Sequence, residues 1–408
     1  MTAVIRIPLG LRNLLRNRRR TAIAVAAICF GVIAMLLAGG FIEWIFWAMR
    51  ESAIQGRLGH IQVTRPGYRE AGVADPFAYL LSEESPQFRV LGEFPHVRLV
   101  TPRLRFSGLA SHGPASVSFN GEGVEPEKEG ELSVDFRIST GQDLAGAEES
   151  SVVLGTGLAK NLGVQPGDTI TLLATTRSGG PNALELVVAG IFFTSDQVLN
   201  ESTLRLPISV ARRLLRVSGA HSWVILLDET KRTENLLREL QVNLPEEKFE
   251  LTPWYEMADF YRKTERLFSR QMQMMQLVVA LIILLSISNV MTMSVLERAS
   301  EIGTMMAIGV KRGRILRLFL AEGATLGLMG GVIGTTLGVG LAQTISRIGI
   351  PMPPAPGMEE GFTGEILVTW PLVAGGLALA LMTTCIASVY PAWKASRMEI
   401  VNALRHNR

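Results

Sequence analysis

The chain has 408 residues and a formal net charge of +3, and 48% of its residues are hydrophobic whereas only 19% are charged. A water-soluble domain usually carries about a quarter charged residues, so this composition, with a mean hydropathy of +0.27, indicates a membrane protein with a soluble part and excludes intrinsic disorder. The two cysteines, Cys29 and Cys385, lie in apolar stretches, which excludes a secreted fold held by disulfides.

Four apolar windows without a charged residue are each long enough to cross a bilayer as a helix, which takes about 20 residues. They cover residues 21–42, 272–295, 323–346 and 370–390, and the first continues as an apolar run to about residue 49. A cleaved signal peptide is the alternative for the first window. The 20 residues before it, the length of the apolar run and the lack of a clean cleavage site favour an uncleaved span.

Basic residues near the span ends set the expected orientation. They are Arg6, Arg12, Arg16, Arg18, Arg19 and Arg20 before the first span, Arg298, Lys311, Arg312, Arg314 and Arg317 between the second and third, and Lys394, Arg397, Arg405 and Arg408 after the fourth. The segment between the third and fourth spans carries Glu359, Glu360 and Glu365, with Arg347 at the span end. We therefore expect both termini and residues 296–318 in the cytoplasm, and we expect no nucleic-acid partner, because the basic excess serves as an orientation signal.

The residues between the first two spans are predicted to form an external mixed α/β domain. Residues 51–270 hold 23 basic and 29 acidic side chains, which gives a net charge of −6. Short β-rich runs cover residues 60–64, 97–106, 169–173, 185–193 and 222–227, and helical patterns cover residues 209–216 and 230–240. We expect the acidic patch at residues 122–131 to be a solvated loop.

Residues 254–270 are amphipathic and run into the second span without a helix-breaking residue. We expect one long helix here, which would rise from the membrane as a stalk and join the external domain. Residues 51–56, directly after the first span, are expected to form a second stalk. A plain connector is an equally open alternative for both segments.

The residues that nucleotide hydrolysis and several other reactions require are missing from the sequence. No G-x-x-x-x-G-K-[ST] segment is present to hold nucleotide phosphates, and neither H-E-x-x-H nor G-x-S-x-G occurs. The histidines lack ligand spacing, so we expect no catalytic residues and no bound metal. The four apolar windows contain no charged residue, although proton- and ion-coupled carriers normally need one. Energy for transport is therefore expected to come from another protein.

Glycines recur every four residues in the third span. They are Gly323, Gly327 and Gly331, and then Gly330, Gly334 and Gly338. Small residues at this spacing leave one helix face bare and permit close helix–helix packing in lipid. A phosphate-binding loop is the alternative for residues 330–340, but this segment is apolar and lies within a span, so we expect helix packing.

The segment after the second span combines charged and apolar side chains. The charged ones are Glu297, Arg298 and Glu301, and the apolar ones that follow are Ile302, Met305, Met306 and Ile308. Such a short amphipathic helix would lie along the membrane or dock onto a cytoplasmic partner, and Gly303 and Gly309 would bend or end it. A solvated loop is the alternative.

This segment resembles the permease subunits of the MacB/LolC-LolE/FtsX superfamily of ABC transporters. The matching residues are Asn289, Ser294, Glu297, Arg298, Glu301, Ile302, Gly303, Ala307, Gly309, Phe319, Glu322 and Gly323, followed by the glycine repeat. Residues 390–396 with 403–405 are similar to the superfamily's C-terminal signature, and residues 162–168 are similar to a recurring turn of its external domain.

The resemblance implies a mechanotransmission (type VII) permease that works as a dimer, with a second copy or a paralogue, beside a separate pair of ABC ATPase subunits. ATP and Mg²⁺ would then be bound by the partner ATPase, and this chain would bind no cofactor. The cytoplasmic segment would be the coupling helix that contacts the ATPase, through Glu297, Arg298, Glu301, Ile302, Gly303, Ala307 and Gly309. ATP-driven closure would move the stalk helices and the external domain.

The expected architecture is membrane α-helical, with four transmembrane helices and a large mixed α/β periplasmic domain between helices 1 and 2, in the bacterial inner membrane. In chain order we expect a cytoplasmic segment (1–20), transmembrane helix 1 (21–49), the MacB-like periplasmic domain with its stalks (50–270), transmembrane helix 2 (271–295), the coupling helix (296–318), transmembrane helix 3 (319–346), a periplasmic loop (347–368), transmembrane helix 4 (369–391) and a cytoplasmic tail (392–408).

The layout is closest to the lipoprotein-releasing LolC/LolE group, which implies extraction or transport of a lipoprotein or lipid from the inner membrane. A candidate substrate cavity would lie between the first two spans, near Phe41, Trp44, Phe46, Met272 and Met275. Lipid-facing or packing side chains are the alternative there. In that group a hook recruits a periplasmic carrier, and the matching residues 177–184 are short and glycine-rich.

Two other functions within the superfamily stay open. The first is a MacB-like efflux permease, which would work with a periplasmic adaptor. The second is an FtsX-like regulator of cell-wall hydrolases, which would move no substrate. Membrane lipids are expected to contact the spans in every case.

Overall fold

The computed structural model describes residues 18–72, 74–146, 150–354 and 361–398. The chain divides into two compact units. We call Met1–Phe46, Thr264–Pro351 and Thr363–Arg408 the helical unit, and Trp47–Lys263 with Met352–Phe362 the α/β unit. Several predictions lie outside the described residues: those on Arg6, Arg12, Arg16, Glu359, Glu360, Arg405 and Arg408, and those on most of residues 1–20 and part of 392–408.

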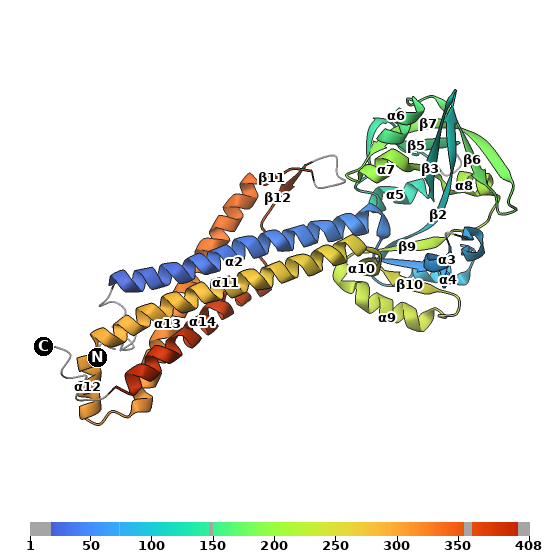
Figure 1. Ribbon diagram of the computed structural model, residues 1–408. Helices are drawn as coiled ribbons and strands as arrows, with labels where there is room; N and C mark the ends of the chain where they lie inside the picture. The colour runs from blue at the N-terminus through green and yellow to red at the C-terminus, as the bar shows by residue number, and fades with distance from the viewer. Residues whose placement is uncertain (1–17, 73, 147–149, 355–360, 399–408) are drawn as a thin grey trace, which may run out of the picture. The chain divides into compact units, whose positions relative to one another are not determined.

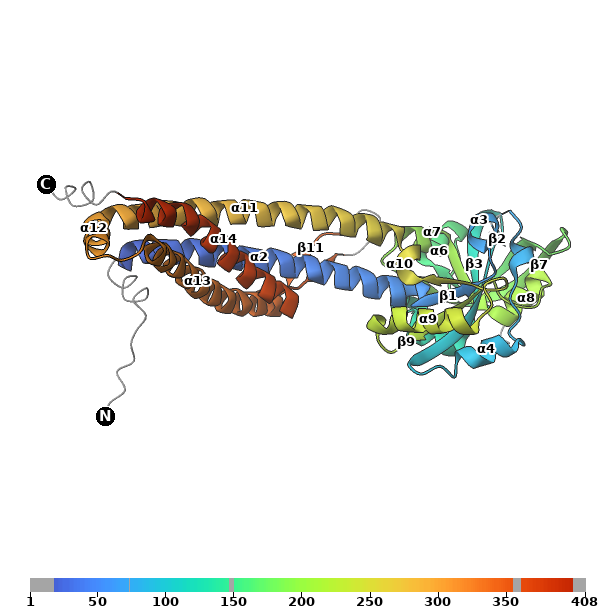
Figure 2. The same cartoon turned by 90° about the horizontal axis from the view of Figure 1, so that it is seen from below.

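Among the described residues, four helices are long and apolar enough to cross a bilayer. They are α2 (Arg18–Ala53), α11 (Asp259–Glu297), α13 (Arg312–Ile348) and α14 (Trp370–Ser396), and within the helical unit they run side by side (Figures 1 and 2). Each holds one of the predicted apolar windows, so the prediction of four transmembrane helices is confirmed. The 39 residues of α11 measure about 58 Å at 1.5 Å per residue, which is longer than a hydrocarbon core of about 30 Å.

The core of the helical unit consists of large apolar side chains that face inward from each helix. Ile28 of α2, Ile287 of α11 and Phe319 of α13 are each at most 1% exposed. Leu281 and Leu285 of α11 face outward and are more than half exposed. Water would disfavour this outer surface, whereas lipid tails are as apolar as leucine.

Two short segments connect the long helices. The helix α12 (Ala299–Ala307) lies between α11 and α13, and the strands β11 (Ile350–Met352) and β12 (Phe362–Gly364) form a two-stranded sheet between α13 and α14. The predicted segment 296–318 thus holds the end of α11, all of α12 and the first turns of α13. The third long helix begins at Arg312, earlier than the predicted span at 319.

Within the described part of the α/β unit, ten strands form one sheet in the order β10-β1-β9-β2-β3-β8-β5-β7-β4, and β6 pairs with β2 and β7. The strands are β1 (Ile61–Thr64), β2 (Val97–His112), β3 (Ala115–Val124), β4 (Arg137–Gly141), β5 (Ser151–Gly155), β6 (Thr169–Thr175), β7 (Pro181–Phe193), β8 (Thr203–Pro207), β9 (Ser222–Leu227) and β10 (Glu250–Pro253). Parallel and antiparallel pairs both occur, as β3 with β8 and β2 with β3.

Short helices complete the α/β unit, which confirms the predicted mixed α/β class. They are η1 (Ile54–Leu58), α3 (Tyr68–Ala71), η2 (Pro76–Tyr79), α4 (Pro86–Leu91), α5 (Pro126–Leu132), α6 (Thr156–Leu162), α7 (Gln197–Ser202), α8 (Ile208–Leu215), η3 (Thr230–Arg232), α9 (Thr233–Asn243) and α10 (Trp254–Met257). The π-helical turn η1 follows α2 directly and leads into β1.

The long strand β2 joins two halves of the sheet. Its residues from Val97 to Arg103 pair with β9, and its residues from Leu104 to His112 pair with β3. Each half has its own apolar core. Leu104 and Leu154 belong to one core, and Trp223 and Ile225 belong to the other. Arg103 therefore lies where the strand leaves one half for the other.

Two expectations for this unit need correction. The long helix expected from residue 254 into the second span is confirmed from Asp259 on, because α11 is continuous from there to Glu297. It is wrong at its start, where Ala258 leaves the helical conformation (φ −88°, ψ 68°) and separates α10 from α11. Ala258 is buried in a small apolar cluster with Trp254. The acidic patch 122–131 is not a solvated loop either. It comprises the end of β3 and α5, and Glu122 and Glu129 are each only 6% exposed.

Candidate functional site

The helix α12 has one buried face and one exposed face. Ile302 and Gly303 are buried against the helical unit, whereas Glu301, Thr304 and Ala307 are exposed. Residues three or four apart on a helix lie on the same side, so the exposed residues form one continuous surface. We call Glu301, Thr304, Ala307 and Ile308 the outer face of α12.

Gly309 ends this helix. Its φ of +92° lies in the left-handed region that favours glycine, and its N–H donates to the Met306 carbonyl at 3.0 Å. Ile308, directly before it, is 76% exposed. The predicted coupling residues Glu301, Ala307 and Gly309 thus lie at the exposed surface.

The other predicted coupling residues face inward or pair within the chain. Arg298 is 5% exposed, and its Nη1 atom lies 3.2 Å from Oε2 and 3.4 Å from Oε1 of Glu322 on α13. Glu297, at the end of α11, forms an ion pair with Arg20 of α2, and both side chains are about 40% exposed. Arg298, Ile302 and Gly303 therefore belong to the packing of α12 on the helical unit.

The glycine repeat of α13 packs against two helices. A β-carbon added at Gly323 or Gly327 would collide with Ser388 or Thr384 of α14, whereas one at Gly330 would lie 2.7 Å from Ile28 Cβ of α2. Gly331 adjoins Leu377 of α14, and Gly334 and Gly338 adjoin α2. The Cys29 thiol also donates to the Gly330 carbonyl at 3.2 Å. The bare surface thus contacts α14 at one end and α2 at the other, whereas the sequence predicted only that one face is bare.

Replacing Gly334 with alanine is expected to destabilise the helical unit by about 1–3 kcal/mol, because overpacking has costs of this size. The new β-carbon would lie 2.9 Å from the Cα atom of Cys29, which is backbone and cannot rotate away. Gly340→Ala on the same helix is the matched control, since no atom lies within 4 Å of its β-carbon. Thermal unfolding in detergent measures both. Equal midpoints for the two variants would contradict close packing at Gly334.

The residues of the candidate substrate cavity are half-buried in α2 and α11. The rings of Phe41 and Trp44 stack with centroids 6.3 Å apart, and both adjoin Gly364 of β12. Phe46 meets Phe268 edge-on at 6.1 Å. Met272 lies near Gly39 of α2, and Met275 is half-buried in α11. These contacts favour packing side chains, and the proposal of an acyl-chain site there has no further support from the geometry.

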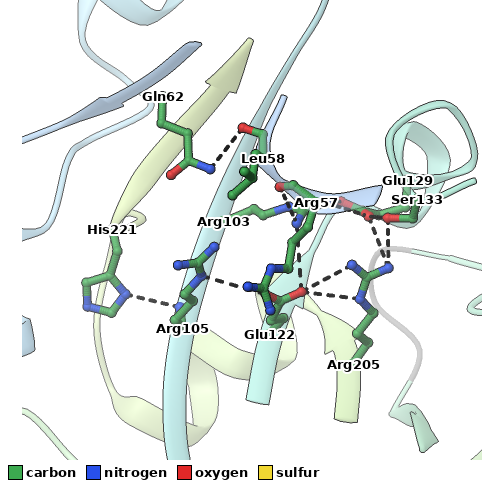
Figure 3. Close-up of polar contacts among 10 residues, drawn as sticks. All are labelled: Arg57, Leu58, Gln62, Arg103, Arg105, Glu122, Glu129, Ser133, Arg205 and His221. Atoms are coloured by element: carbon green, nitrogen blue, oxygen red, sulfur yellow. Dashed lines mark hydrogen bonds and ion pairs between the residues drawn. The ribbon is translucent and has the colours of Figure 1, made fainter. Parts of the chain in front are cut away.

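A buried ionic cluster, absent from the predictions, lies in the α/β unit. We use this name for Arg103, Glu122, Glu129 and Arg205, which come from β2, β3, α5 and β8 and converge in Figure 3. Arg103 Nη2 donates to both oxygens of Glu129, at 3.0 and 2.9 Å. Arg205 donates to Glu122 Oε2 from Nη2 at 3.1 Å and to the Ser133 hydroxyl at 2.8 Å. Ser133 in turn donates to Glu129.

The ionic cluster also holds the turn that follows α2. Arg103 Nη1 donates to the backbone carbonyl of Arg57, in η1, at 3.1 Å (Figure 3). Arg205 additionally stacks over the Phe136 ring, with its Cζ atom 3.4 Å from the centroid. The cluster thus joins η1, both halves of the sheet and α5 at the point where β2 crosses between the halves.

Charges in this cluster shift one another's ionisation. Burial opposes ionisation of Glu122, but Arg205, Arg103 and Arg105 together hold the pKa of this carboxyl well below its usual value. Burial lowers the pKa of the Arg205 guanidinium, while Glu129 and Glu122 counteract this effect. Glu122 is therefore ionised at neutral pH.

Comparisons with known proteins assign this architecture. Residues 21–242 match the family model of the MacB-like periplasmic core domain, and residues 274–400 match that of the FtsX-like permease C-terminal region. The chain belongs to the ABC transporter permeases of the MacB/LolC/FtsX type. The superfamily resemblance predicted from the sequence is thereby confirmed.

Relatives of this permease extend over its whole length. It is 23% identical to an uncharacterized ABC transporter permease of Methanocaldococcus jannaschii, over 98% of this chain and 97% of the relative. It is 24% identical to the lipoprotein-releasing system transmembrane protein LolC of Xylella fastidiosa, over 98% of each chain. Among solved structures, the periplasmic region of MacB from Actinobacillus actinomycetemcomitans matches 53% of this permease and 98% of that chain, at 15% identity and a TM-score of 0.38.

Proposed function

We propose that this permease couples ATP hydrolysis by separate ABC ATPase subunits to movement of its α/β unit, and that the ATPase docks on the outer face of α12. ATP and Mg²⁺ bind the ATPase, and this chain contributes no catalytic residue. The permease acts as a dimer, with a second copy or a paralogue, in the bacterial inner membrane. The α/β unit lies in the periplasm, and α12 lies in the cytoplasm.

The outer face of α12 is the observation that carries this proposal. It presents a carboxylate, Glu301, and a strongly exposed Ile308 within two helical turns. The opposite face is anchored by Ile302, which is fully buried. A helix that is buried on one side and accessible on the other can be displaced by a docked protein, and its displacement then moves the helices on which it packs. The basic residues Lys311, Arg312 and Arg314 beside it support the cytoplasmic location.

The proposed substrate is a lipoprotein or a membrane lipid that is extracted from the inner membrane. Support comes from similarity over full length to a protein named as part of a lipoprotein-releasing system. A periplasmic carrier or adaptor completes the path in this proposal. Residues 177–184 comprise the turn between β6 and β7 and the first residues of β7. The turn is closed by the Thr176 hydroxyl, which donates to the Gly180 carbonyl at 2.8 Å, so a carrier would find only a small docking surface there.

Purification of the tagged full chain in mild detergent, followed by mass spectrometry, tests the proposal. We expect an ABC ATPase to copurify, ATP turnover to require that ATPase, and a lipoprotein or lipid to be recovered with the complex. An adaptor with an outer-membrane channel would replace the substrate proposal with efflux, and a cell-wall hydrolase would replace it with regulation. ATP turnover by the chain alone, after rigorous removal of contaminants, would contradict the proposed division of labour.

A further inference from the structure

A buried ion pair between Arg298 and Glu322 connects the start of α12 to α13. Arg298 precedes α12 and Glu322 lies in the first third of α13, and their side chains are only 6% and 4% exposed. We propose that these two are positioning residues, which fix α12 on α13 so that a displacement of α12 moves α13 with it. The coupling part of this inference rests on the proposed function, whereas the fixing of α12 does not.

Arg298 does not contact a docked ATPase in this arrangement. Its guanidinium points to Glu322 through Nη1, at 3.2 Å, and its Nε atom is buried without a hydrogen-bond partner. A docking residue would need an accessible charge. Arg298 therefore acts through Glu322, and only the outer face of α12 is left to meet a partner.

Stability alone does not explain a buried ion pair at this place. Taking two charges out of water costs more than their attraction usually returns, and apolar residues of similar volume are often neutral or stabilising replacements. A buried ion pair can fix the register of one helix against another, because a shift of either helix would leave a buried charge without its partner. Apolar side chains tolerate such a shift more easily. The pair is thus suited to hold one fixed position of α12 against α13.

Contacts of the residues next to Arg298 and Glu322 link this pair to the rest of α12 and to α14. The Ile302 N–H donates to the Arg298 carbonyl at 2.9 Å, so the first turn of α12 begins at the pair. On α13, Phe319 is buried one turn before Glu322, and the next residue, Gly323, lies against Ser388 of α14. The pair thus connects α12 to both α13 and α14.

The neighbouring pair of Arg20 and Glu297 does not serve the same purpose. Both side chains are about 40% exposed, and exposed ion pairs are weak and screened by salt. It links α2 to the end of α11, not to α12. Of these two ion pairs, only that of Arg298 and Glu322 therefore holds α12.

An apolar replacement of both residues tests this inference without leaving a charge unpaired. In R298M/E322L, we expect the full chain in nanodiscs to stay folded. Hydrogen exchange of the α12 amides should become at least about tenfold faster, because without the pair α12 can shift along α13 and leave its packed position more often, even where the overall stability is unchanged. In the complex with its ATPase, we expect stimulation of ATP turnover by the permease to fall at least about tenfold.

The swapped pair R298E/E322R is expected to restore most of the slow exchange of α12 and most of the ATPase stimulation. R98M/E131L, which removes an exposed pair of the α/β unit, is the control and should change neither.

The two readouts separate the possible failures. Unchanged exchange of α12 in R298M/E322L overturns the inference, whatever the ATPase does. Faster exchange with stimulation equal to the wild type overturns the coupling role of the pair. If exchange is faster in the variant but even the wild-type permease stimulates no ATPase, the fixing of α12 by the pair is supported. The proposed function, and with it the coupling role of the pair, is then rejected.

Discussion

Replacing Arg103 with methionine is expected to destabilise the α/β unit by about 3–5 kcal/mol, because removal of one partner of a buried ion pair leaves an uncompensated charge. Arg103 is fully buried and donates to Glu129 and to the Arg57 carbonyl. Its loss leaves Arg205 as the only arginine of the cluster beside Glu129, and Arg205 with Arg105 beside Glu122. Urea denaturation of the full chain in detergent, with pulse proteolysis of the α/β unit as the readout, measures the change.

Arg98→Met is the matched control for this prediction. Arg98 lies on the same strand, and its ion pair with Glu131 is about half exposed, so its removal should change the free energy of unfolding by less than about 1 kcal/mol. Similar losses in both variants would show that the ionic cluster does not hold the unit together.

Acidification should reduce the difference between the wild type and Arg103→Met. The folded-state pKa of Glu122 is depressed, so its contribution to stability is present above the unfolded-state pKa of about 4.3 and is lost as the pH falls toward the folded-state pKa. Without Arg103 this depression is smaller. The unfolded-state pKa is the same in both chains, so the difference in unfolding free energy should stay constant as the pH falls until it reaches the folded-state pKa of Glu122 in the variant, and should narrow below that pH. A difference that grows on acidification would contradict the assignment.

Glu301→Lys is expected to abolish stimulation of the partner ATPase while membrane insertion stays intact. Glu301 lies on the outer face of α12, and reversal of its charge would place a positive charge against a surface that is complementary to a carboxylate. Like charges across an interface cost several kcal/mol, and every 1.4 kcal/mol is about a tenfold change in affinity. Stimulation should fall at least about tenfold. ATPase assays with the purified complex, at equal permease content, measure this effect.

The control for this prediction is Glu265→Lys. It makes the same charge change on an exposed residue of α11, outside α12. Normal insertion and normal stimulation are expected for this variant. Stimulation of Glu301→Lys at the wild-type level would remove the outer face of α12 from the coupling path.

The long helices were predictable because hydrocarbon admits few kinds of segment. Each span is an uninterrupted apolar run, and backbone groups in lipid must bond within the helix. The glycine repeat also predicts close helix packing. The sequence does not predict the partners, which are α14 for Gly327 and α2 for Gly334. A four-residue spacing gives the bare surface of one helix but no partner for it.

The ionic cluster was not predictable in the same way. The four residues Arg103, Glu122, Glu129 and Arg205 come from four different elements, with Arg205 more than 70 residues after the others, and each looks like a solvated charge in its own segment. One local signal existed: Arg205 lies between Leu204 and Leu206 in a short apolar run, and all of β8 is buried. The sequence around Arg103 gives a weaker signal, because β2 is continuously buried only over residues 100–104, where it passes from one half of the sheet to the other.

The coupling segment was predictable as an amphipathic helix but not in its orientation. The alternation of apolar and polar residues gave the buried Ile302 and the exposed Glu301. Arg298 is the exception, since a charged residue at this position is expected to face water and instead meets Glu322, 24 residues later in the chain. Pairings over such a distance depend on how α11, α12 and α13 fold back on one another.

The accessibility of single cysteines on the two sides of the membrane tests the central claim most directly. With Cys29 and Cys385 replaced by alanine, Ser178→Cys places a thiol in the exposed turn between β6 and β7, and Ala307→Cys places one on the outer face of α12. In right-side-out spheroplasts, an impermeant maleimide should label Ser178→Cys at once and Ala307→Cys only after the membrane is permeabilised. Labelling in the reverse order would put α12 out of reach of any cytoplasmic ATPase and would contradict the account.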